Sequence, residues 1–250
     1  MGRTIAIGDI HGEIGHLDRL LAKLPTLGQG DTLVFLGDYV DRGPASAQVI
    51  ARIREIQARS EAKVVALRGN HEDAWLQVVE KGWVEFVIPR MNGCLEAKRS
   101  FLGEPPADEE EAPGPDELKV LLDGSFFPKD VVEWMKTLPF FYEDEHAIYV
   151  HAGLIAKEGA FQHPSVTEPQ RALLWTRSRE FFADYRGKLV VVGHTATRLL
   201  PVELSSYTPE DPTDLWAGEA VVAIDTACSK PGGFLTAILL PDKLVYESRD

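Results

Sequence analysis

LGDYVDRGP, residues 36–44, begins as the end of an apolar run and finishes as a polar turn. The run Thr32–Leu36 predicts a buried strand, and Asp38, Asp41 and Arg42 follow it within a few residues. Taken alone, the stretch also fits an ordinary turn at the end of a strand, because Asp and Gly are common turn residues. Two carboxylates and a guanidinium directly after a buried strand nevertheless favour a site for metal and phosphate.

The same pattern stands on either side of this stretch. The apolar run Thr4–Ile7 leads to Asp9 and His11, and the run Lys63–Leu67 leads to Asn70. Asp9 and His11 are two residues apart and should project from one side of an extended strand end. After each strand, apolar spacing or a well-placed proline predicts a helix, over Glu13–Leu24, Pro44–Arg59 and from near His71 to about Lys81.

Alternating strands and helices predict an α/β fold with a largely parallel sheet, whose ligands lie beyond the carboxyl ends of the strands. Two later strands end in the same way, His146–Val150 at His151 and Lys188–Val192 just before His194. All these strand-end residues should therefore meet at one edge. A further strand follows, and then two that read as a hairpin, at Ala220–Ile224, Phe234–Leu240 and Leu244–Glu247.

The residues at the strand ends are oxygen and imidazole donors without a thiolate, namely Asp9, His11, Asp38, Asn70, His151 and His194. Such donors suit Mn, Fe or Zn better than a structural zinc or a calcium site. Six ligands fit two ions that share one carboxylate. Two metals roughly 3.5–4 Å apart suit in-line attack on phosphorus, and they supply hydroxide near neutral pH from bound water.

The remaining polar groups complete a hydrolytic site. Arg42 can fork onto phosphate oxygens, and His71 can act as general acid with Asp41 holding its tautomer. The sequence contains no nucleophile-elbow serine, no catalytic cysteine loop and no P-loop. Direct attack by hydroxide bound to the two metals is therefore the economical mechanism.

Five ordered motifs, GDIHG (8–12), GDYVDRG (37–43), GNHE (69–72), HAG (151–153) and GHT (193–195), resemble the phosphoprotein phosphatase family of calcineurin-like metallophosphatases. The resemblance implies a single-domain β-sandwich flanked by helices and two divalent ions, commonly Mn²⁺ in bacterial members, with Fe, Zn or Ni as other choices. It implies that Asp9, His11 and Asp38 bind the first metal, and that Asp38, Asn70, His151 and His194 bind the second.

The resemblance also implies the catalytic roles. His71 is the family's general acid, paired with Asp41, and Arg42 matches its phosphate-binding arginine. Asn70 is placed beside the phosphate as well. The segment LLWTR (173–177) resembles a bacterial motif whose arginine contacts phosphate, so Arg177 is a further candidate.

Three functions can be compared with these motifs. GNHE and Asp41 favour a serine/threonine phosphoprotein phosphatase over the related dinucleoside polyphosphate (Ap4A-type) hydrolases, which typically carry GNHD and often lack that aspartate. An inactive binding module would require the loss of a ligand or of the acid, and the sequence retains them all. The expected partners are phosphorylated proteins or peptides or, in the alternative, phosphorylated nucleotides.

Composition bounds the remaining choices. With 250 residues the chain suits one domain, and its net charge of −13 argues against nucleic acid as a partner. The sequence lacks a membrane-spanning apolar run and begins without the apolar segment of a signal peptide. Cys94 and Cys228 are far apart and read as reduced, so we expect a cytoplasmic protein.

One acidic segment interrupts the pattern of strands and helices. The stretch at about 103–117 holds seven acids and four prolines and no basic residue. This composition predicts a mobile, solvated insertion, with a lid that selects substrates by charge as the alternative.

Overall fold

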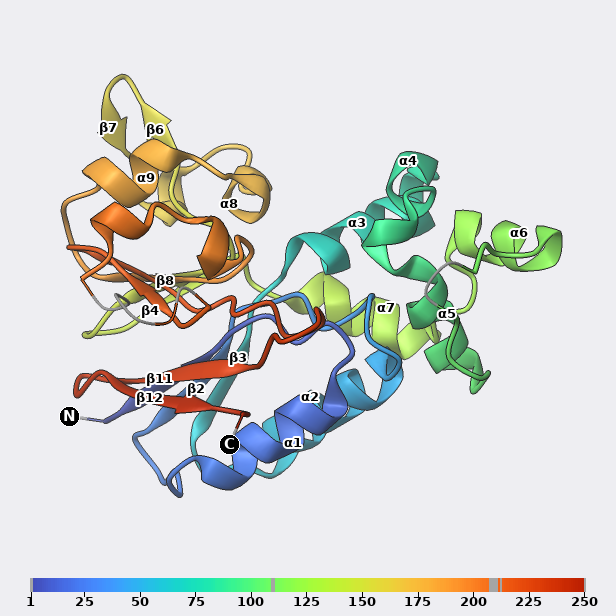
Figure 1. Cartoon of the computed structure of the whole chain (residues 1–250), viewed down its shortest axis with the longest axis horizontal. Coiled ribbons are helices and arrows are strands. Elements are labelled where there is room, and N and C mark those ends of the chain that lie inside the picture. Colours follow the sequence, from blue (N-terminus) through green and yellow to red (C-terminus); the bar gives the residue numbers. More distant parts are fainter. Residues whose placement is uncertain (1, 109–110, 207–210, 212, 250) are drawn as a thin grey trace.

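A computed structural model describes residues 2–108, 111–206, 211 and 213–249. Two five-stranded sheets pack face to face (Figure 1). The first sheet has the order β12-β11-β1-β2-β3. Its strands are β1 (Thr4–Ile7), β2 (Thr32–Phe35), β3 (Lys63–Ala66), β11 (Thr236–Leu240) and β12 (Leu244–Glu247).

The second sheet has the order β4-β5-β8-β10-β9. Its strands are β4 (Phe141–Glu143), β5 (Ile148–Val150), β8 (Val190–Val192), β9 (Trp216–Ala217) and β10 (Val221–Ala223). A small separate hairpin joins β6 (Ala156–Lys157) to β7 (Ala160–Phe161).

The expectation of one largely parallel sheet is wrong. Strands β1, β2 and β3 are parallel, as are β5, β8 and β10, but antiparallel strands complete both sheets. Short connections account for two of the antiparallel pairs, since β4 turns directly into β5 and β11 turns into β12. The β-sandwich flanked by helices, which the family resemblance implied, is confirmed.

The alternation of side chains along each strand fixes the layers. In the first sheet, Ala6 and Val34 face the second sheet and pack with Val191. Their neighbours Ile5 and Phe35 point to the opposite side, into the core beneath the helices. Because both faces of the central strands are covered, β1 and β2 are apolar after their first residue, a threonine, as in other buried parallel strands.

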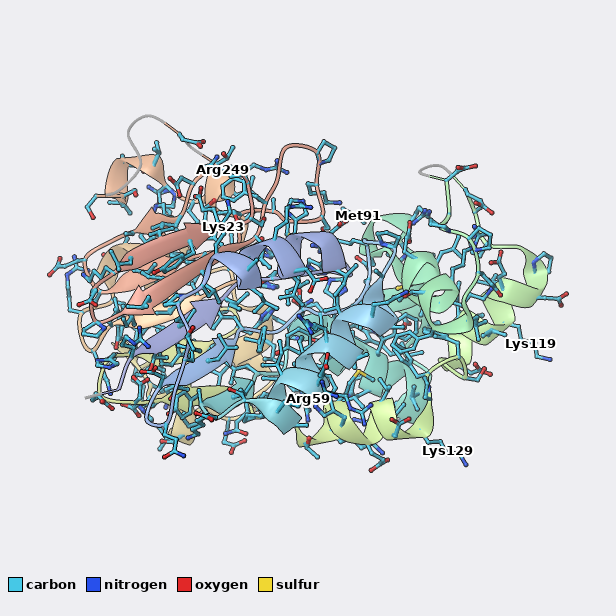
Figure 2. The ribbon with its side chains drawn as sticks, turned by 90° about the horizontal axis from the view of Figure 1, so that it is seen from below. Lys23, Arg59, Met91, Lys119, Lys129 and Arg249 are labelled. Carbon is cyan, nitrogen blue, oxygen red and sulfur yellow. The ribbon has the colours of Figure 1, made fainter. Side chains whose placement is uncertain are left out.

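Helices α1 (Ile14–Lys23), α2 (Ser46–Arg59) and α3 (Asn70–Lys81) follow β1, β2 and β3 and bury their apolar sides in the same core. At the end of the last strand, the Lys23 Nζ of α1 donates to the carbonyl of Arg249 at 2.6 Å (Figure 2). The second sheet is covered by α8 (Ala172–Trp175) and α9 (Arg179–Asp184).

Four more helices form an extension beside the sheets (Figure 1). Figure 2 shows Lys119 at its outer end. The helices are α4 (Val84–Val87), α5 (Cys94–Leu102), α6 (Pro115–Asp123) and α7 (Lys129–Thr137). Short 3₁₀ turns complete the described chain, at η1 (Arg90–Asn92), η2 (Pro164–Val166), η3 (Thr197–Leu199) and η4 (Val202–Leu204).

The acidic segment 103–117 is tied to α5 by ion pairs. The Lys98 ammonium lies 2.5 Å from the carboxylate of Glu104 and 3.0 Å from that of Glu117. Arg99 binds Glu111 and also Glu117, the latter at 3.2 Å. Residues 115–117 begin α6, so the prediction of a loop is wrong at this end, while residues 109–110 lie outside the described part. The charge partners come from α5, which the composition of the segment itself does not reveal.

These ion pairs predict an acid-sensitive contribution to stability. Burial opposes the ionisation of Glu117, but Arg99 and Lys98 outweigh it and hold the carboxyl pKa at about 2. A lowered pKa in the folded state stabilises the protein above the ordinary value of 4.5, and this stabilisation is lost as the pH falls towards 2. Glu117→Gln should therefore lower the free energy of unfolding by about 1 kcal/mol at neutral pH, after allowance for solvent screening.

Denaturant unfolding across the acid range measures this effect. The difference between Glu117→Gln and the unmodified protein should shrink as the pH falls below 4.5. The exposed neighbour Asp116 supplies the matched control, Asp116→Asn. An equal loss of stability in both variants would show that the ion pairs of Glu117 are not the cause.

Candidate metal and phosphate site

The loops that follow β1, β2, β3, β5 and β8 meet at one edge of the sandwich. They bring together all six predicted ligand residues, and every one is buried. These are Asp9, His11, Asp38, Asn70, His151 and His194. The predicted convergence of strand-end side chains is thus observed, although the strands belong to two sheets.

Asp38 lies at the centre of the cluster. Its carboxylate is 3.4 Å from His11 Nε2 through one oxygen and 3.4 Å from His151 Nε2 through the other. Two groups of potential ligand atoms, each within 4.8 Å of one another, share it: His11, Asp38 and His71, and Asp38, His151 and His194. This arrangement is the one expected of a carboxylate that bridges two ions.

Asn70 joins the second group. Its side-chain oxygen lies 3.0 Å from His151 Nε2 and 2.7 Å from His194 Nδ1. Asn70 is the first residue of α3, so the helix start fixes this amide between the two imidazoles. Three nitrogen and oxygen donors from three separate loops therefore converge beside Asp38.

Asp9 is absent from the first group of potential ligands, although the family resemblance implied that it binds the first metal. The first group contains His71 in the place predicted for Asp9. Both oxygens of Asp9 accept the backbone N–H of His194, at 3.2 and 3.0 Å. Burial, with the charges of Asp225 and Asp38, raises the pKa of Asp9 well above its ordinary value. A cation here would relieve this repulsion, and the assignment of Asp9 as a ligand stays a prediction.

The backbone of the site is left-handed at several non-glycine residues. Positive φ angles occur at His11 (47°), Asp38 (54°), Asp41 (72°), Arg42 (67°) and His194 (64°). The expectation that Asp9 and His11 project from an extended strand end is therefore wrong, because β1 ends at Ile7 and His11 lies in a turn with a left-handed backbone. Such conformations cost free energy and cluster at functional sites, where the surrounding contacts hold them.

Glu72 holds the central loop in this shape. Its carboxylate accepts the backbone N–H groups of Asp38 at 2.9 Å, Tyr39 at 2.8 Å and Gly69 at 3.0 Å. A Cβ on Gly69 would collide with the backbone and carboxylate of Asp38, so only glycine permits this approach. Burial and then the charge of Asp38 raise the pKa of Glu72 to about 7. Glu72 thus supports the loop through these backbone hydrogen bonds.

His71 is oriented by a buried carboxylate. Its Nδ1 lies 2.6 Å from an oxygen of Asp41, and Trp75 Nε1 donates to both oxygens of Asp41, at 2.9 and 3.0 Å. His71 Nε2 is left facing the cluster, 3.9 Å from Asp38. The predicted pairing of His71 with Asp41 is present, and the indole of Trp75 adds a contact that the sequence motifs did not indicate.

Two arginines reach the same cluster. Arg42 Nη1 lies 2.6 Å from His11 Nε2, and Arg42 Nη2 lies 3.3 Å from His71 Nε2. Arg177 Nη1 donates at 3.2 Å to the carbonyl of His194 and at 3.2 Å to the hydroxyl of Thr195. Both guanidinium groups are thus placed where an anion at the cluster could bind them, and their roles as phosphate ligands stay predictions.

The donor set fits divalent cations. Burial lowers the pKa of His11, His151 and His194, which keeps these imidazoles neutral and able to bind metal. Burial opposes the ionisation of Asp38, but the positive charge that neighbouring histidines, His151 first, carry when protonated holds its pKa well below the usual range. His194 Nε2 is buried and has no hydrogen-bond partner among the described residues. Imidazole nitrogens of His151 and His194 beside carboxylate and amide oxygens match the ligands of Mn, Fe or Zn.

Asp225 is a functional candidate that the sequence reasoning missed. It lies two residues after the end of β10, is buried near Asp9, and has its pKa raised chiefly by burial. Its carboxylate accepts the backbone N–H of Ala227 at 2.9 Å, in the turn that follows. The signal was available, because the predicted strand Ala220–Ile224 ends at this aspartate as the earlier strands end at theirs.

The chain matches the family of calcineurin-like phosphoesterases over residues 2–198 and belongs to that family. This confirms the resemblance carried by the five motifs. Members of the family use two divalent metals, and the cluster around Asp38 supplies the candidate ligands. Among the helices of the described residues, none combines the length and apolar character needed to cross a membrane.

Individual relatives point in two directions. The chain is 32% identical over 171 residues to the symmetrical bis(5'-nucleosyl)-tetraphosphatase of Burkholderia thailandensis, an alignment that covers 68% of this chain and 49% of the relative. It is 40% identical over 67 residues to the serine/threonine-protein phosphatase 6 catalytic subunit of Drosophila melanogaster, covering 26% of this chain and 21% of the relative. The chain thus spans half or less of these two curated relatives.

A solved structure of a candidate diadenosine tetraphosphatase has the same fold. The TM-score is 0.60 at 22% sequence identity, and the match covers 98% of this chain and 92% of that one. At this identity the likeness establishes the fold alone.

Proposed function

We propose that the whole chain acts as one catalytic domain that hydrolyses phosphoric esters at a centre of two divalent metal ions. The observation that carries the proposal is the position of Asp38, which belongs to both groups of potential ligands. Mn²⁺ is the proposed metal, with Fe, Zn or Ni as other choices. The proposed ligands are Asp9, His11, Asp38, Asn70, His151 and His194.

When bound, the two ions would activate a water molecule and neutralise charge on the phosphate. The chain's own residues would do the rest. Arg42, Arg177 and Asn70 would bind the phosphate oxygens and hold the phosphorus in line. His71 would give the proton on Nε2 to the leaving oxygen, while Asp41 keeps its partner nitrogen, Nδ1, hydrogen-bonded.

Phosphoserine and phosphothreonine in proteins are the first proposed substrates. Their leaving group is an alkoxide, a strong base that departs readily only when an acid protonates it. The dyad of His71 and Asp41, with its 2.6 Å contact, supplies such an acid. A serine/threonine phosphatase uses every part of this site.

Dinucleoside polyphosphates are the second proposed substrates. The relative aligned over 171 residues carries the name of a tetraphosphatase, whereas the named protein phosphatase aligns over 67 residues. The leaving group of a polyphosphate is a weaker base than an alkoxide and depends less on protonation. The same metals and the same arginines would serve this reaction.

A side-by-side assay tests both. The protein is stripped of metal, reloaded with Mn²⁺, and given either a phosphoserine/phosphothreonine peptide or diadenosine tetraphosphate. We expect turnover that chelation abolishes. A preference for the peptide of about tenfold in kcat/KM, or about 1.4 kcal/mol, would support the protein phosphatase. The same preference for the dinucleotide would assign the second function, and no turnover of either would contradict the proposal.

A further inference from the structure

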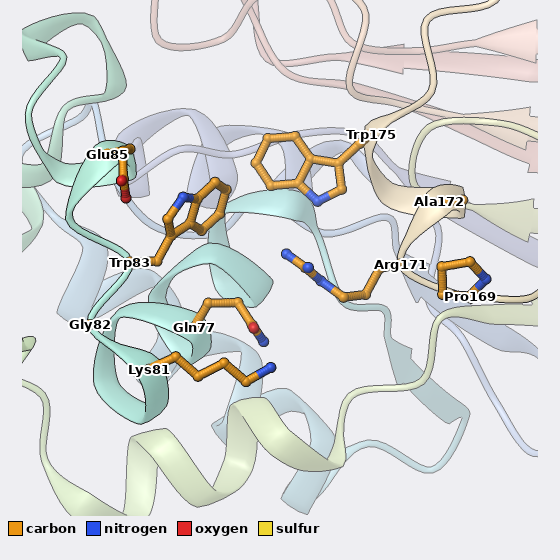
Figure 3. Close-up of a pocket in the computed structure, with 9 residues that line it drawn as sticks. All are labelled: Gln77, Lys81, Gly82, Trp83, Glu85, Pro169, Arg171, Ala172 and Trp175. Carbon is orange, nitrogen blue, oxygen red and sulfur yellow. The ribbon is translucent and has the colours of Figure 1, made fainter.

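A cleft of about 770 Å³ lies between the end of α3 with α4 on one side and α8 on the other. Its volume falls within the range of small-molecule sites. Figure 3 shows the ends of the Gln77, Lys81 and Arg171 side chains reaching into the space that two indoles border. The residues used below are Gln77, Lys81, Trp83, Glu85, Arg171 and Trp175.

Two tryptophans form the aromatic part of the cleft. The ring centroids of Trp83 and Trp175 are 5.8 Å apart, and the rings meet at 67°, edge to face. Trp175 keeps 36% of its surface exposed. The Arg171 guanidinium carbon lies 5.9 Å from the Trp83 ring centre. The exposed indole of Trp175, with Arg171 over the neighbouring Trp83 ring, forms a platform on which a flat ring can stack.

The arginine is held in place, and the lining of the cleft holds two positive side chains, Arg171 and Lys81, and one negative side chain, Glu85. Arg171 Nε donates to the buried Asp73 at 2.6 Å, and Arg68 approaches the same carboxylate at 3.7 Å. Two arginines thus share one aspartate. Lys81 forms no ion pair with any residue that the structure describes. On a protein of net charge −13, this region is suited to an anionic ligand.

Residues on both sides of the cleft are connected to the metal and phosphate site by short contacts. On one wall, Trp175 is two residues from Arg177, which donates to His194 and Thr195. On the other, the Trp83 ring stacks on Phe86 at 5.9 Å, and the Phe86 ring meets His71 edge to face at 5.3 Å. A substrate whose phosphate lies at the cluster would extend naturally towards the cleft.

We infer that this cleft is a subsite for the base of a nucleotide whose phosphates occupy the neighbouring cluster. The inference rests on the proposed hydrolase function and selects a nucleoside polyphosphate as the substrate class. Stacking on Trp175 would hold the ring, and Arg171 with Lys81 would attract the charged chain. Gln77 and Glu85 offer both donors and acceptors for the ring edge, which a base needs and the apolar ring of a peptide phenylalanine does not.

Trp175→Ala and Trp175→Phe test the subsite. Each Mn²⁺-loaded variant is assayed with diadenosine tetraphosphate, with a phosphoserine peptide and with p-nitrophenyl phosphate, which is too small to reach beyond the cluster. Trp175→Ala should lose roughly tenfold or more in kcat/KM on the dinucleotide relative to p-nitrophenyl phosphate, mainly through KM. Trp175→Phe keeps a stacking ring and should recover most of that loss.

A binding measurement separates this inference from the proposed activity. Titration of the metal-free protein with ADP should quench tryptophan fluorescence, inorganic phosphate should not, and Trp175→Ala should lose the quenching. If no substrate is turned over but ADP quenching depends on Trp175, the hydrolase proposal fails while the subsite stands. Equal losses on all three substrates without ADP quenching, or a selective loss on the peptide, would overturn the subsite.

Discussion

Asp38→Asn should bind fewer than two metal ions per chain and should lose at least about 10³-fold in kcat, or ~4 kcal/mol of transition-state stabilisation. The carboxylate of Asp38 serves both groups of potential ligands, one oxygen for each. An amide offers one oxygen and one NH₂ group, so it cannot bridge two ions. Metal content by elemental analysis and turnover in Mn²⁺ should fall together.

The substitution by asparagine separates the loss of metal from a loss of folding. Asp38 has a φ of 54°, a conformation that Asn tolerates well, and its Oδ1 accepts the His71 N–H at 3.0 Å, which an amide oxygen can replace. Loss of folding is therefore not expected, and thermal unfolding without metal checks this. Asp18→Asn on the exposed side of α1 is the matched control and should bind two ions. Two tightly bound ions in Asp38→Asn would refute the bridging role.

The sequence was sufficient to predict which residues meet at the site. Each strand, turn and helix start lies within a short stretch, so local signals place Asp38, Asn70 and His151 at strand ends. The rule that such ends share an edge then brings them together. The structure has all three in one cluster, with Asn70 Oδ1 3.0 Å from His151 Nε2. The prediction worked because it needed only local order and one general rule of topology.

The sheet arrangement needed information that no short stretch contains. β1 pairs with β11 from the far end of the chain, with Thr4 opposite Leu240. The second sheet has edge strands as short as β9, two residues long, which leave almost no periodic signal. The sandwich of two sheets therefore came from the family resemblance, whereas the pattern of residues predicted the antiparallel hairpin of β11 and β12 at one edge.

The supporting contacts of the site were hidden for a similar reason. Trp75 reaches Asp41 across 34 positions of sequence, and Arg171 reaches Asp73 across 98. Trp75 looks like core in the sequence, and the core does enclose it, but its one polar atom faces a carboxylate. The left-handed backbone at Asp41 and Arg42 is equally invisible, because neither residue type demands it.

His71→Asn should retain two metal ions and lose about 10²–10⁴-fold in kcat on a phosphoserine peptide, the range for removal of a general acid. The loss should be much smaller on p-nitrophenyl phosphate, whose leaving group departs without a proton. The test also decides between two roles, because His71 is one of the three residues of the first group of potential ligands. A role as acid and a role as ligand thus predict different metal contents for one variant.

Measurement of bound metal and of leaving-group dependence in the same samples separates the two roles. An acid leaves the metals in place and shows a loss that grows with the basicity of the leaving group. A ligand loses metal and affects all esters alike. His163→Asn is the control, since His163 is partly exposed and lies outside the cluster. Its Nε2 is 2.9 Å from the carboxylate of Glu143. Because Asp41 already occupies Nδ1 of His71, only Nε2 is available for either role, and the 2.6 Å contact that orients it favours proton transfer to the leaving oxygen.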